Sequence, residues 1–128
     1  MSEHTIGDLV IAHYKTGKYV GEITNIRSNG YIVVKILAVL KHPMQGDLHH
    51  PKQTEVEFFH ERKALAYREQ TNIPSNMVRP YTEKLPTYTD SLRQSLESLK
   101  QELHTDGSKW AKMCLNCLAS LEREYTLT

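Results

Sequence analysis

The segment of residues 73–81 constrains the fold more than any other part of the chain. Pro74 fixes φ at about −65°, and the Ser and Asn that follow it hydrogen-bond nearby backbone groups in tight turns. Ile73 before this turn and Val78 after it are apolar, so both can return to a core. Short apolar runs precede the segment, and helical spacing follows it. The sequence therefore predicts a small β-barrel that ends here and carries a helical appendage.

Three strands are predicted before the first long polar stretch. Gly21 lies inside the second strand and indicates a bulge or bend. Asn29 and Gly30 favour a hairpin, because both residues readily adopt positive φ. The third strand is almost continuously apolar, so we expect burial on both of its faces. The three strands are residues 6–14, 19–26 and 31–40.

Residues 41–53 interrupt this pattern with two Pro, one Gly and three His, and predict a loop of the length that often serves a partner or a function. Residues 54–59 predict a further strand. Residues 61–70 are compatible with a helical turn or a strand, and we favour a strand because Val78 needs a partner in the sheet.

Two helices are predicted after a linker that contains Pro86. Thr89 or Asp90 can cap the first helix, Gly107 can end it, and Ser108 can cap the second. A short break between two amphipathic helices predicts an antiparallel hairpin. We therefore expect a barrel domain, residues 1–84, and a hairpin packed on it, residues 85–128. The apolar stripes are Leu92, Leu96, Leu99 and Leu103, then Trp110, Met113, Cys114, Cys117, Leu118, Leu121 and Tyr125.

Two groups of residues invite a metal or redox interpretation. Cys114 and Cys117 form a C-x-x-C pair, but they lie in the middle of an apolar helix stripe and lack a second ligand pair, so we favour a place in the core. His42, His49 and His50 with Asp47 could bind a metal or transfer protons. Their spacing matches no known metal motif, and we favour a polar loop. No cofactor is expected.

The chain shows no nucleophile elbow, glycine-rich phosphate loop or dinucleotide fingerprint, so we predict that it is not an enzyme. Its 16 Lys and Arg balance 15 Asp and Glu, which gives no general attraction to nucleic acid or to membranes. A nucleic-acid-binding barrel that uses its tyrosines for stacking is the alternative. We find no signal peptide and no apolar run near the roughly 20 residues of a membrane helix, so we expect a cytoplasmic protein.

Six stretches together resemble the kinase-associated protein B family of spore-forming bacilli. The resemblance implies an SH3-like barrel in an accessory protein of a membrane sensor histidine kinase that feeds the sporulation phosphorelay. It implies no catalytic residue. The family is often called a lipoprotein, but this chain lacks a lipobox, so we expect membrane contact only through a partner. The stretches are GDLV at residues 7–10, YKTGKYVGE at 14–22, LAVLKHP at 37–43, GDLH at 46–49, FFHERKALAYRE at 58–69 and IPSNMVRPY at 73–81.

The long loop and the aromatic residues after it are the predicted partner surface, because long loops on a rigid scaffold often carry binding residues. The alternative surface is the helical hairpin, if Trp110 and Tyr125 are exposed, and the hairpin is also a candidate contact for a homodimer. The predicted surface consists of His42, Gln45, Gly46, Asp47, Leu48, His49, Phe58, Phe59 and Tyr67.

Overall fold

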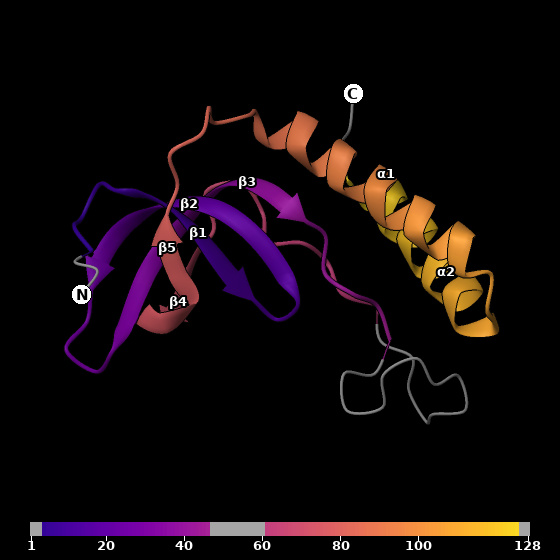
Figure 1. Ribbon diagram of the computed structural model, residues 1–128, viewed down its shortest axis with the longest axis horizontal. Helices are drawn as coiled ribbons and strands as arrows, with labels where there is room; N and C mark the ends of the chain where they lie inside the picture. The colour runs from indigo at the N-terminus through magenta and orange to yellow at the C-terminus, as the bar shows by residue number, and fades with distance from the viewer. Residues whose placement is uncertain (1–3, 47–60, 126–128) are drawn as a thin grey trace.

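The computed structural model describes residues 4–46 and 61–125. Five antiparallel strands form one curved sheet in the order β4-β3-β2-β1-β5 (Figure 1). The edge strands β4 and β5 do not pair with each other in this part of the chain, so the sheet is barrel-like but not closed. The strands are β1 (Leu9–Tyr14), β2 (Gly17–Ile26), β3 (Tyr31–Lys41), β4 (Gln70–Pro74) and β5 (Val78–Pro80).

The first two hairpins follow the sequence prediction. Lys15 and Thr16 have φ of 45° and 69° and form the two-residue turn between β1 and β2. Gly30, with φ of 87°, lies in the turn between β2 and β3. The predicted bulge is confirmed, since the register of β2 against β3 shifts between Val20 and Gly21.

The predicted strand at residues 61–70 is wrong for most of its length. β4 starts only at Gln70, and it pairs with β3 rather than with β5. Val78 finds its partner in Ala12 of β1 instead. The turn around Pro74 is confirmed as a single 3₁₀ turn, Ser75–Met77. The predicted strand at residues 54–59 lies outside the described residues.

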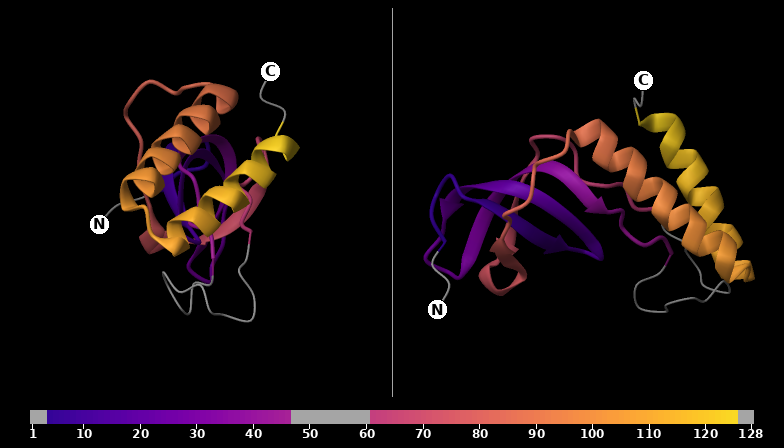
Figure 2. Two further views of the ribbon diagram at one scale, coloured as in Figure 1. Left: turned by 90° about the vertical axis from the view of Figure 1, so that its right-hand side faces the viewer. Right: turned by 45° about the horizontal axis from the view of Figure 1, so that its top comes forward.

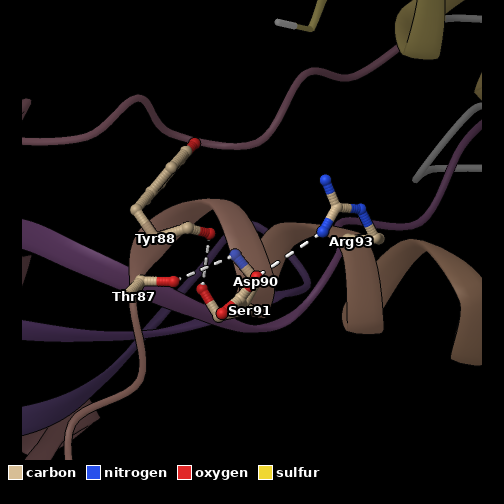
Figure 3. A network of polar contacts seen from close by, with 5 residues as sticks. All are labelled: Thr87, Tyr88, Asp90, Ser91 and Arg93. Atoms are coloured by element: carbon tan, nitrogen blue, oxygen red, sulfur yellow. Dashed lines mark hydrogen bonds and ion pairs between the residues drawn. The ribbon is translucent and has the colours of Figure 1, made fainter. Parts of the chain in front are cut away.

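Two helices, α1 (Tyr88–Asp106) and α2 (Lys109–Glu124), form the predicted hairpin. Gly107 ends α1 with φ of 67°, and the Ser108 hydroxyl caps α2 by accepting from the Ala111 N–H. The cap predicted at Thr89 or Asp90 is wrong. Thr87 caps α1 by accepting from the Asp90 N–H, and the Asp90 carboxylate lies 3.5 Å from Arg93 (Figure 3).

The helices lie side by side at the end of the sheet where β3 stops (Figures 1 and 2). Inward residues of the sheet and both helices form one hydrophobic cluster. β3 is buried on alternate residues, so the prediction of burial on both faces holds only for Ala38 and Val39. There α1 covers the strand, and the Val39 N–H donates to the Ser91 hydroxyl at 2.9 Å.

The shared core shows that the hairpin packs on the sheet, and the division at residue 84 stays a prediction. Neither α1 nor α2 combines the length and the apolar character that a bilayer-spanning helix needs.

Candidate functional site

Residues 62–66, the clamped segment, run alongside the helices without forming a strand. Their backbone groups bond to tyrosine hydroxyls from three separate elements. The Leu65 N–H donates to Tyr19 of β2 at 3.3 Å, and the Ala64 N–H donates to Tyr125 at 2.9 Å. Tyr88 of α1 donates to the Leu65 carbonyl at 2.6 Å. The segment therefore needs no neighbouring strand, which explains why the strand prediction failed.

Gln45 holds the start of the clamped segment in the way a strand neighbour would. Its amide oxygen accepts from the Arg62 N–H at 2.7 Å, and its amide nitrogen donates to the Arg62 carbonyl at 2.9 Å. The same nitrogen donates to the Pro43 carbonyl at 2.9 Å. Arg62 returns a bond from its guanidinium to the Gly46 carbonyl. The two chain segments that flank residues 47–60 are thereby joined by side chains.

His42 holds the Tyr125 hydroxyl in place by a hydrogen bond. Its Nδ1 lies 3.0 Å from the Pro43 carbonyl, which can only accept, so Nδ1 carries the proton. Nε2 is then the acceptor for the Tyr125 hydroxyl at 2.9 Å. Burial lowers the pKa of His42, against an opposing effect of the Pro43 hydrogen bond. The network holds His42 neutral in one tautomer and leaves Tyr125 free to accept from Ala64.

Burial corrects part of the predicted partner surface. His42 and Gln45 are 0% and 4% exposed, and Gly46 is also buried, so these three residues stabilise the interior and do not face a partner. Both ring nitrogens of His42 are occupied by protein groups, which argues against its use as a metal ligand or proton-transfer group. The remaining loop candidates lie outside the described residues: Asp47, Leu48, His49, His50, Phe58 and Phe59.

Tyr67, which directly follows the clamped segment, is 55% exposed. Its ring lies 5.7 Å from the ring of Tyr88, tilted by 51°. Two open clefts of about 480 and 450 Å³ meet at these two tyrosines and Thr89. Leu85 and Pro86 line the second cleft, and Leu85 is partly exposed. We define the Tyr67 surface as Tyr67, Leu85, Pro86, Tyr88 and Thr89.

Sequence reasoning missed Leu85, Pro86, Tyr88 and Thr89 as surface residues because they fall in the stretch assigned to a linker and a helix cap. An apolar Leu-Pro pair, separated by one threonine from an aromatic residue, was the available signal. Of the predicted partner residues, Tyr67 alone is described and exposed.

The cysteines support the core interpretation. Cys114 is 1% exposed, and Cys117 is half-buried. Burial and the neighbouring Cys117 raise the pKa of the Cys114 thiol to about 12, whereas redox cysteines need a lowered pKa. Trp110 is also buried, so the apolar stripe of α2 packs within this molecule. Among the described residues, this stripe is therefore not exposed for the predicted homodimer contact.

Comparison with known proteins decides the family. The sequence profile named Kinase associated protein B matches residues 14–126. The chain belongs to the kinase-associated protein B family. A family relative from Bacillus subtilis (strain 168), Kinase-associated lipoprotein B, is 57% identical over 125 residues, which are 98% of this chain and 97% of the relative. This confirms the family resemblance found in the sequence.

A solved structure of the same family gives the fold independently. The crystal structure of kinase-associated protein B from Bacillus cereus has a TM-score of 0.83 and 45% identity to this chain. The match covers 98% of this chain and 100% of the other. A mostly β, barrel-like domain with a C-terminal helical pair is therefore confirmed, and the more specific SH3-like assignment stays a prediction.

Proposed function

We propose that this protein is a non-enzymatic accessory factor of a kinase pathway that acts by protein–protein contact through the Tyr67 surface. Family membership supports the kinase pathway, since the relatives are named kinase-associated. The partner we propose is a sensor histidine kinase, or a signalling protein bound to it, that feeds the sporulation phosphorelay. The protein would then act in the cytoplasm, at the inner face of the membrane when its partner is there.

The contact between the exposed ring of Tyr67 and the half-buried ring of Tyr88 is the observation that carries the choice of surface. Tyrosine offers a large contact area at low entropic cost, and aromatic residues are enriched at the energetic centres of interfaces. The Tyr88 hydroxyl already bonds to Leu65, which fixes its ring and presents one face to the clefts. The clamped segment fixes the backbone just before Tyr67. Binding of a partner would therefore order few additional groups on this surface, because the fold already holds them in place.

The test measures binding of the full chain to the purified cytoplasmic portion of the sensor histidine kinase by calorimetry. Tyr67→Ala is expected to weaken binding by about thirtyfold, because a central aromatic truncation costs about 2 kcal/mol. Tyr31→Ala is the matched control, since Tyr31 is a similarly exposed tyrosine at the start of β3. Equal affinities of the Tyr67→Ala protein and the wild type would contradict the proposed surface.

A further inference from the structure

Four basic side chains lie in a row across the sheet, one on each of β5, β1, β2 and β3. Three of them are Lys or Arg, and the fourth is a histidine. His13 is directly opposite Lys18, and Lys18 is directly opposite Lys41. Arg79 is opposite Ile11, two residues from His13 and so on the same side of the sheet. Adjacent strands are about 4.8 Å apart, so this basic row spans roughly 14 Å.

The basic row is not neutralised by acidic residues of the described chain. Elsewhere on β2 and β3, Lys35 forms an ion pair with Glu22 at 3.7 Å. Lys18 and Lys41 have no such ion pair within residues 4–46 and 61–125, although Glu102 of α1 lies across a small cleft from both. Burial, and then the charges of Arg79, Lys18 and Lys41, lower the pKa of His13. Like charges on opposed residues destabilise a sheet, so the row costs free energy when it is empty.

The row borders a cleft of about 610 Å³ that combines positive charge with adaptable apolar side chains. Met44 and Met77 line it beside Tyr14, and the Lys15 ammonium lies 5.3 Å from the centre of the Tyr14 ring. Methionine adapts to irregular partners. Carboxylates interleaved with apolar residues would therefore satisfy both halves of the cleft.

We propose that the basic row binds an acidic segment of a protein partner, as a second contact separate from the Tyr67 surface. A segment of four or five residues in extended conformation has the length of the row, at about 3.3 Å per residue. The whole chain carries a net charge of only +1, so it lacks the broad field that draws proteins to membranes or nucleic acid. The inference does not depend on the partner being a kinase.

The experiment uses the full chain and three fluorescent probes: a peptide in which glutamate alternates with leucine and serine, a single-stranded oligothymidylate, and vesicles that contain phosphatidylglycerol. The test variant removes three charges of the row, and the control variant removes three exposed charges elsewhere. The test variant is Lys18→Gln, Lys41→Gln and Arg79→Gln, and the control variant is Lys84→Gln, Lys109→Gln and Lys112→Gln.

The acidic peptide is expected to bind the wild type and the control variant alike, and to bind the test variant about tenfold more weakly. The single variant Lys41→Gln changes one exposed side chain and keeps the test decisive if the triple variant fails to fold. Equal loss in both triple variants would overturn the proposal. Stronger, row-dependent binding of the oligonucleotide or the vesicles would overturn the choice of an acidic protein segment.

Discussion

The sheet and the clamped segment hold their backbones in opposite ways. In the β2–β3 hairpin, backbone groups bond to backbone groups along most of both strands. In the clamped segment, backbone groups bond to the side chains of Tyr19, Tyr88, Tyr125 and Gln45. A ladder survives many side-chain changes, as long as volumes fit. A segment held by side chains depends on single hydroxyl and amide groups, and this is the segment that leads to Tyr67.

The largest effect on stability is expected from added side-chain volume inside the sheet. A Cβ on Gly21 would lie 2.4 Å from a Val34 methyl group and 2.6 Å from the Lys35 carbonyl oxygen. Because that oxygen is part of the ladder, Gly21→Ala should lower the free energy of unfolding by about 3 kcal/mol. Chemical denaturation measures it. Gly30→Ala has open space at the same atom and should cost only about 1 kcal/mol for its positive φ. Similar losses in both variants would contradict this account of Gly21.

Removing the Tyr125 hydroxyl, which holds the clamped segment, should lower the free energy of unfolding by nearly as much. Tyr125→Phe deprives the Ala64 N–H of its acceptor and the buried His42 of its donor, and both hydrogen bonds are partly buried. An unsatisfied buried group costs about 1–3 kcal/mol, so we expect a loss of about 2 kcal/mol. In the control, Tyr81→Phe removes an exposed hydroxyl that donates to the Lys84 carbonyl, and it should cost under about 0.5 kcal/mol. Denaturation curves that coincide for the two variants would contradict the role given to Tyr125.

A smaller effect is expected from pH. The folded pKa of His42 lies below its ordinary value of 6.5, so the unfolded chain binds the proton more tightly. The stability that neutral His42 contributes is complete above about pH 6.5 and declines as the pH falls toward the lowered folded value. His13 acts in the same direction. Urea unfolding across this range should show a shallower pH dependence in His42→Gln than in the wild type. If stability depended on pH equally in His42→Gln and in the wild type, His42 would be excluded as a source of this pH dependence.

The sequence predicted what depends on regular patterns. Short apolar runs located β1 to β3, Asn29 and Gly30 located a hairpin, and Gly107 and Ser108 located the break between helices. These features are local in the sequence, because each one is marked by residues within a few positions of one another. The family resemblance came from short stretches of sequence and was confirmed.

The side-chain bonds to the clamped segment were not predictable in this way. Tyr19, Tyr88 and Tyr125 are far apart in the sequence, and no periodic pattern joins them to residues 64–65. A polar, histidine-containing stretch was expected to be exposed, whereas His42 and Gln45 are buried because each satisfies its polar atoms with backbone or tyrosine partners. Burial of polar residues of this kind depends on contacts that only the folded chain provides.

Amide hydrogen exchange tests the central claim, that side chains hold the clamped segment and so position Tyr67. The comparison is between the wild type and Tyr125→Phe, with the amides of β3 as an internal reference for global stability. The account predicts that the Ala64 amide loses more protection than the β3 amides do. Equal losses at Ala64 and in β3, or an Ala64 amide that exchanges as in the wild type, would contradict it.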